Sequence, residues 1–165
     1  MAAFTDVTNG IPDARWLQPQ APGKWTPAEE VLHVALSYEV ALRGMRTGAG
    51  MRARVSPMRA RLLRWLVLPV IVNSSWFPRA KAPAEIRPPA VAATGHGEFA
   101  AHALCARLER VARDVRDELP LASPDLRFRH AYFGDLAPRQ ALRMLSAHTR
   151  HHTRVLARRF PKVAE

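Results

Sequence analysis

The chain has 165 residues, 48% of them hydrophobic and 24% charged, which predicts a single globular domain (residues 1–165) with a sizeable core. Its formal net charge is +11, but most of the basic residues are arginines spread along the whole chain, so the clustered basic face typical of nucleic-acid binding is missing and the composition argues against nucleic acid as a partner. The single cysteine, Cys105, excludes an internal disulfide and any cysteine-based zinc site.

Residues 1–24 are predicted to form an N-terminal tether or the remnant of a first helix. The first ten residues lack the basic region and the apolar run of a signal peptide, so secretion is not expected. Glycine, proline and glutamine are frequent from residue 9 to 23, which leaves room for at most a helical turn over residues 13–17. With the single cysteine, this start favours a cytoplasmic location.

The first long helix is predicted over residues 27–43. Thr26 is a candidate N-cap, Pro27 follows at the first helical position, and Glu29 completes a capping box. The helix is expected to stop among the glycines of residues 44–50. His33 lies at the edge of its broad apolar face, where a histidine can be either a hydrogen-bonded structural residue or a ligand.

The second helix is predicted over residues 57–73, with a kink at Pro69, followed by a surface crossover at 74–94. The apolar run at 62–72 is interrupted by Arg64 and is too short to span a bilayer, which needs about 20 apolar residues. It is therefore interpreted as a buried core helix. The basic residues that precede it leave peripheral contact with anionic lipid as the less favoured alternative.

The third helix is predicted over residues 95–119, with one apolar stripe and a charged opposite face. Cys105 lies in the stripe and is interpreted as a small core residue. His102 borders the stripe and is a candidate for the wall of a pocket. Pro120 is expected to end the helix.

The last helix, predicted over residues 138–160, carries the main chemical signal. His148 and His152 are four residues apart and therefore lie on one face, in line with the apolar stripe, whereas His151 is rotated towards the arginines. Each buried imidazole without a partner would cost about 1 to 3 kcal/mol. A divalent metal would satisfy both, given a third ligand, although seven histidines in one chain also allow a chance pair.

Two segments, "GKWTPAEEVLHVALSYE" and "HAYFGDLAPRQALRMLSAHTRHHTRVL", resemble the DinB-like (DinB/YfiT) family. Members are four-helix bundles in which one histidine of an early helix and an HxxxH pair of the last helix bind a divalent metal. The resemblance implies that His33, His148 and His152 are the metal ligands. The "HAYFG" segment looks like the HPxFG element of one branch of the family, which implies that His130 lies near the mouth of the pocket.

The chain departs from the family pattern at several places. Many relatives have glutamine where this chain has Val155, and Ala131 replaces the proline of HPxFG. The region that normally forms the first helix, before Trp25, is short and rich in proline and glycine. Either the first helix is truncated, or the helix at 57–73 or a partner chain, as in a homodimer, takes its place.

Three imidazoles leave coordination positions open for water or substrate, which is typical of catalytic sites, and they suit Zn, Ni, Fe or Cu equally. By resemblance, the leading hypothesis is a metal-dependent thiol S-transferase or hydrolase-like enzyme that acts on a small electrophilic substrate, with a low-molecular-weight thiol such as bacillithiol or mycothiol as cosubstrate. The alternative is a non-enzymatic, stress-related binding bundle with a structural metal or none. The fold is expected to be all-α with no sheet, and His33 is expected to lie within a few Å of His148 and His152.

Overall fold

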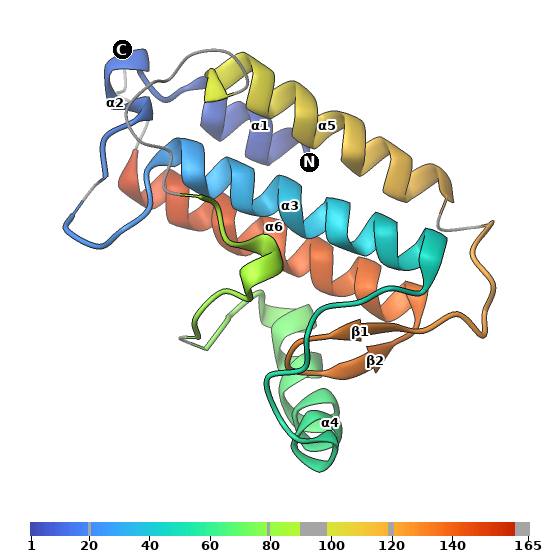
Figure 1. Ribbon diagram of the computed structural model, residues 1–165. Helices are drawn as coiled ribbons and strands as arrows, with labels where there is room; N and C mark the ends of the chain where they lie inside the picture. Colours follow the sequence, from blue (N-terminus) through green and yellow to red (C-terminus); the bar gives the residue numbers. More distant parts are fainter. Residues whose placement is uncertain (20, 79, 90–98, 119–120, 161–165) are drawn as a thin grey trace.

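The computed structural model describes the chain apart from residues 20, 79, 90–98, 119–120 and 161–165 (Figure 1). Most of the described chain is helical, and long helices occupy all four predicted regions, as expected for an all-α bundle. In chain order the elements are α1 (Ala2–Asn9), α2 (Asp13–Trp16), α3 (Pro27–Thr47), α4 (Pro57–Ser74), the 3-10 turn η1 (Ala84–Ile86), α5 (Ala101–Glu118), β1 (Phe128–His130), β2 (Gly134–Leu136) and α6 (Pro138–Arg159).

The core of the bundle is formed by α3, α5 and α6, with the short α1 as the fourth helix (Figure 1). Helix α1 packs against both α5 and α6, and its Phe4 side chain is fully buried among them. In α2, Trp16 is also buried, and its indole Nε1–H donates to the carbonyl of Phe99 at 3.1 Å. The first helix is therefore truncated, and α4 does not replace it.

Helix α3 begins at the predicted residue and ends at Thr47. The Thr26 hydroxyl accepts a hydrogen bond from the Glu29 backbone N–H at 3.1 Å, and the Glu29 carboxylate accepts from the Thr26 N–H at 2.8 Å, which completes the capping box. The helix stops within the predicted range of residues 44–50, but Gly44 is still helical, and a Cβ there would lie only 2.9 Å from Phe128 of β1. Gly44 therefore allows the close packing of Phe128 against the helix. The helix ends at Gly48, which has a left-handed conformation (φ 69°).

The expectation that the protein has no sheet is wrong in one place. Strands β1 and β2 form an antiparallel hairpin in which Phe128 pairs with Leu136 and His130 with Gly134. The tight connection ends at Gly134, whose φ of +66° favours glycine. The segment after α3 runs beside this hairpin, with the Met51 N–H donating to the Arg129 carbonyl at 2.7 Å. Three-residue strands are too short for their alternation to be visible in the sequence.

Helix α4 is not the buried core helix that its apolar run suggested. Pro57 begins it and Pro69 lies within it, as expected, and the Ser56 side chain caps its N-terminus. Its buried residues Ala60, Leu68 and Ile71 face the rest of the molecule, where α4 contacts α6 and β2. The opposite apolar face is exposed, because α4 projects away from the bundle (Figure 1). None of the helices in the described part of the chain has both the length and the apolar character needed to cross a membrane.

Helix α5 starts at Ala101, later than the predicted residue 95, and residues 95–98 of that prediction lie outside the described part of the chain. The predicted crossover at 74–94 is irregular where it is described, except for η1. Cys105 is half-buried and its thiol contacts the Thr8 hydroxyl, in agreement with a packing role. Burial raises the pKa of this thiol, which disfavours the reactive thiolate.

Candidate metal centre

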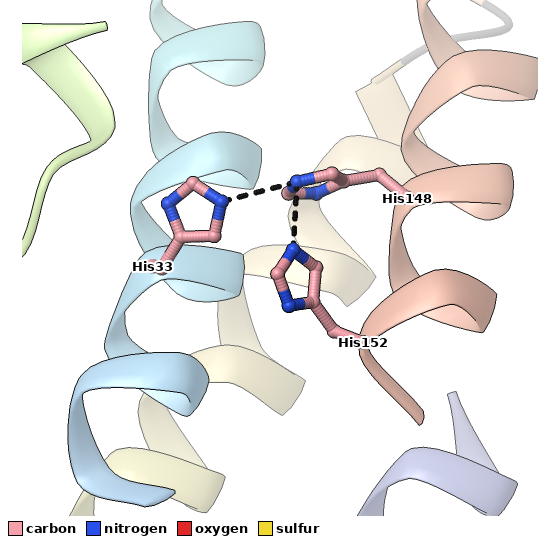
Figure 2. Close-up of side chains that lie close together, drawn as sticks. All are labelled: His33, His148 and His152. Carbon is pink, nitrogen blue, oxygen red and sulfur yellow. Dashed lines mark hydrogen bonds between the residues drawn. The ribbon is translucent and has the colours of Figure 1, made fainter. Parts of the chain in front are cut away.

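Three histidines from two helices meet in the interior of the molecule (Figure 2). Nε2 of His148 lies 3.1 Å from Nε2 of His33 on α3, and 3.1 Å from Nε2 of His152, one turn further along α6. One nitrogen of each residue lies within 4.8 Å of the others. His33 and His152 are 4% and 8% exposed, and His148 is partly buried. The predicted approach of His33 to the HxxxH pair is present in the structure.

The ring of His33 is oriented by the crossover segment. Its Nδ1 lies 2.7 Å from the carbonyl oxygen of Ile86, in η1. A carbonyl only accepts hydrogen bonds, so Nδ1 carries the proton and the neutral ring presents the lone pair of Nε2 to His148. On the other side, the ring of Trp25 packs against His33, with the ring centroids 4.7 Å apart. The irregular crossover thus sets the tautomer of this histidine.

The ring of His152 is oriented by a buried carboxylate. Its Nδ1–H donates to Oε2 of Glu30 at 2.5 Å, and Oε1 of Glu30 accepts from the Arg159 guanidinium at 3.0 Å. Glu30 lies one helical turn before His33 on α3, so one helix supplies both a triad histidine and the carboxylate that orients another. Of the other two glutamates of α3, Glu29 belongs to the capping box and Glu39, in the middle of the helix, pairs with Arg107 at 2.7 Å.

Burial keeps the triad neutral. Desolvation lowers the pKa of His33, and it lowers those of His148 and His152 well below the ordinary value, with the neighbouring imidazoles adding to the effect. Burial also raises the pKa of Glu30, while the charge of Arg159 acts in the opposite direction. At neutral pH the three histidines therefore carry no charge, which is the form in which imidazole binds a metal.

Protons alone do not satisfy the nitrogens that meet at the centre. His33 and His152 both present lone pairs to Nε2 of His148, and a proton on that atom can be donated well to only one of them. Two nitrogens bound to one metal at about 2.0 to 2.1 Å lie about 2.9 Å apart at a right angle and about 3.4 Å apart at the tetrahedral angle. The two observed separations of 3.1 Å fall between these values, so the residues fit a cation.

A cavity of about 790 Å³ opens beside the three histidines. Its wall includes the inner face of α4, the crossover, and parts of α3 and α6. Much of the wall is apolar, with Leu63, Val67 and Ile71 on the α4 side. Within the described part of the chain, the basic residues that line the cavity are Lys24, Lys81, Arg87 and Arg159. Among the described residues, Glu30 is the only carboxylate in the wall. The cavity thus combines a nitrogen-rich base with an apolar and cationic wall.

His130 lines the same cavity, as the HPxFG resemblance implied. Its Nδ1 accepts hydrogen bonds from the backbone N–H groups of Tyr132 and Phe133, at 3.2 and 3.3 Å, and its ring stacks on Phe133. The proton of the neutral ring is therefore on Nε2, which has no hydrogen-bond partner in the described part of the chain. Burial lowers the pKa of His130 to about 4. His130 is thus a neutral residue with one N–H left to donate.

The other two histidines considered from the sequence differ in their positions. His151 is half-buried, lines the cavity and packs on Phe77 with ring centroids 5.1 Å apart, so it is less solvated than its helical phase suggested, but it is outside the triad. The suggestion that His102 faces the pocket is wrong, because its side chain is exposed on α5 and does not line the cavity. The roles of Ile86 and Arg159 depend on residues far apart in the chain and leave no sequence pattern.

The comparison with known protein families agrees with this geometry. The model described as the DinB superfamily matches residues 2–156, which include α1, all three triad histidines and the hairpin. No curated protein and no solved structure matches the chain in these comparisons. A match over nearly the whole chain, together with the helical bundle, identifies the family. The protein therefore belongs to the DinB superfamily.

Proposed function

We propose that this protein binds a divalent metal ion through Nε2 of His33, His148 and His152, and that it is a metal-dependent enzyme acting on a small electrophilic substrate. The observation that carries the proposal is that Nε2 atoms of three neutral imidazoles converge. His33 and His152 carry their protons on Nδ1, so their Nε2 lone pairs both face His148, which can donate to only one of them. A divalent cation held by imidazoles lowers the pKa of a bound thiol or water and so supplies a nucleophile near neutral pH.

The composition of the cavity favours thiol transfer over hydrolysis. Hydrolysis commonly uses a general base beside the metal-bound water, but Glu30 is already engaged by His152 and Arg159. A thiolate attacks without further deprotonation. Lys24, Lys81 and Arg87 line the cavity and suit the carboxylates of a low-molecular-weight thiol such as bacillithiol or mycothiol. We therefore place thiol S-transfer first and a hydrolase-like reaction second.

His130 is suited to bind the electrophile. Its Nε2–H is held in one tautomer by the hairpin backbone, so a donor is present without reorganisation. A carbonyl or other oxygen of the substrate, on which negative charge develops during attack, is the natural acceptor. The apolar wall from α4 would hold the remainder of such a substrate.

The first test is the metal content of the purified protein and of three single variants, measured by elemental mass spectrometry. His148→Ala and His152→Ala should each lose most of the metal, and His151→Ala, the matched control on the same helix, should retain it. Metal should raise the stability of the wild type, by about 2.7 kcal/mol at a hundredfold excess over Kd, and should leave His148→Ala unchanged. Equal metal in all four proteins would rule out the assigned ligands.

The second test separates an enzyme from a binding protein. Wild-type protein should conjugate a thiol with a small electrophile, lose this activity on chelation and regain it when metal is restored. His130→Asn, which keeps an acceptor for the hairpin N–H groups but lacks the Nε2 donor, should retain the metal and lose at least about tenfold in kcat/KM. Metal binding without any metal-dependent turnover would instead support the stress-related binding bundle.

A further inference from the structure

The outer face of α4 exposes a stripe of large apolar side chains. Successive members are four, three, one and four residues apart, which places all of them on one face of the helix. The exposed residues are Met58 (82%), Leu62 (57%), Trp65 (72%), Leu66 (62%) and Val70 (49%), and Trp76 (58%) follows just after the helix. Single exposed apolar residues are ordinary, whereas a contiguous group of this kind marks an interaction surface.

The stripe is bordered by positive charge. Arg59 and Arg61 are exposed and lie at its two edges by helical phase, and neither forms an ion pair in the described part of the chain. Exposed Arg52 and Arg54 immediately precede the helix. Helix α4 itself contains no acidic residue. An occupant of this face must therefore accept apolar side chains at its centre and arginines at its rim.

A second copy of the chain does not meet this requirement. Two copies of the face would bring like charges together, and a stable interface usually involves about 20 to 30 residues on each side, far more than one helix face offers. Nucleic acid would pair with the arginines but would leave the leucines and tryptophans of the stripe without apolar partners. An anionic lipid surface accepts both, with apolar side chains among the acyl chains and arginines at the headgroups.

We propose that the outer face of α4 docks this protein onto an anionic membrane surface. Trp65 and Trp76 suit the interface between headgroups and acyl chains, which aromatic side chains favour. Docking would lay α4 in the plane of the interface. It would also bring the cavity close to the lipid, because Leu63, Val67 and Ile71, on the other face of the same helix, line that cavity. This proposal is independent of whether the histidines bind a metal.

Cosedimentation of the full chain with vesicles tests the proposal. The protein should bind vesicles of phosphatidylcholine mixed with phosphatidylglycerol at low salt, bind pure phosphatidylcholine much more weakly, and leave the anionic vesicles at high salt. A triple variant, Leu62→Ser, Trp65→Ser and Leu66→Ser, should lower the partition coefficient by at least about tenfold. The double variant Arg59→Gln and Arg61→Gln should lower it by about thirtyfold.

Matched controls are available on the far side of the bundle. Arg110→Gln with Arg113→Gln removes the same charge from the exposed face of α5, and Leu121→Ser removes an apolar side chain that is 84% exposed. Both controls should bind the anionic vesicles nearly as well as the wild type. All altered side chains are exposed, so the variants should fold, and circular dichroism with thermal melting checks this.

Three results would overturn the proposal. One is the absence of cosedimentation with anionic vesicles at low salt. Another is a dimer in sedimentation velocity that the triple serine variant converts to a monomer, which would assign the face to a second copy. The third is a combination of two observations. The protein binds duplex DNA tightly, and the arginine variant loses this binding while the triple serine variant keeps it. In addition, the triple serine variant binds anionic vesicles as well as the wild type does.

Discussion

At the scale of single residues, the three triad histidines differ in how their rings are held. The Ile86 carbonyl orients His33 and the Glu30 carboxylate orients His152. Nδ1 of His148 is buried and has no hydrogen-bond partner in the described part of the chain. An oxygen that accepts a hydrogen bond from one ring nitrogen, as those of Ile86 and Glu30 do, increases the basicity of a metal-binding imidazole and restricts its rotation. Glu30 should therefore contribute to metal affinity without touching the metal.

We predict that Glu30→Gln weakens metal binding by about ten- to a hundredfold, because an amide orients His152 but no longer attracts its Nδ1–H as a carboxylate does. Competition with a chromophoric chelator measures the affinity. Glu39→Gln is the matched control, since Glu39 lies on the same helix and pairs with Arg107 away from the triad. If Glu30→Gln and Glu39→Gln bind the metal with equal affinity, the Glu30 carboxylate has a packing role and does not contribute to metal binding.

At the scale of elements, the position of His130 depends on the contact between α3 and the hairpin. The Phe128 side chain of β1 packs against the backbone of Gly44 in α3, where a Cβ would approach Phe128 Cβ to 2.9 Å and Cγ to 3.0 Å. His130 ends the same strand. Close packing at Gly44 thus sets how far the hairpin lies from α3 and how deep His130 reaches into the cavity.

We predict that Gly44→Ala destabilises the protein by about 1 to 3 kcal/mol through overpacking, even though alanine favours a helix over glycine by about 1 kcal/mol. The reason is that the nearest atom is the Cβ of Phe128, which is fixed to the backbone of β1 and cannot swing away like the end of a flexible side chain. Urea denaturation measures the effect. In a Phe128→Gly background, which lacks both the Cβ and the Cγ that the new methyl group would approach, the same change should cost much less stability. A loss of stability that is equal in both backgrounds would contradict the packing account.

At the scale of the whole molecule, the bundle buries a group of histidines that must remain neutral. Burial lowers the pKa values of His33, His130, His148 and His152 below those of the unfolded chain. At pH values between the pKa of the folded and that of the unfolded chain, the unfolded chain binds more protons than the folded one. The free energy of unfolding therefore falls as the pH falls. This stability is fully present above about pH 6.5 and declines below it.

We predict that the metal-free protein loses stability between pH 7 and pH 5, and that His130 alone accounts for about 2 kcal/mol of this loss, because its folded pKa is about 4. His130→Asn removes the titration while keeping an acceptor for the Tyr132 and Phe133 N–H groups. Its stability should therefore change less with pH than that of the wild type. Urea denaturation with chelator at both pH values measures the difference, and identical pH dependence would contradict it.

Local patterns in the sequence determined much of the fold. The capping box at Thr26 and the proline at the first position of α3, α4 and α6 set where these helices begin, because these signals act within one turn. Apolar periodicity predicted the long helices, and the four-residue spacing of His148 and His152 predicted that their imidazoles share a face. The resemblance to DinB-like proteins implied His33 as the third member of the triad.

Only the tertiary structure decided what depends on contacts between distant segments. The close approach of Phe128 leaves no room for a side chain at Gly44, and Ile86 and Glu30 orient histidines that lie far from them in the chain. Helix α4 shows the limit most clearly, since an apolar run fits a buried helix and an exposed one equally well. The position of the whole helix decides which of its faces is buried against the rest of the protein. Burial depends on the assembled fold, whereas apolar periodicity depends only on the geometry of the helix itself.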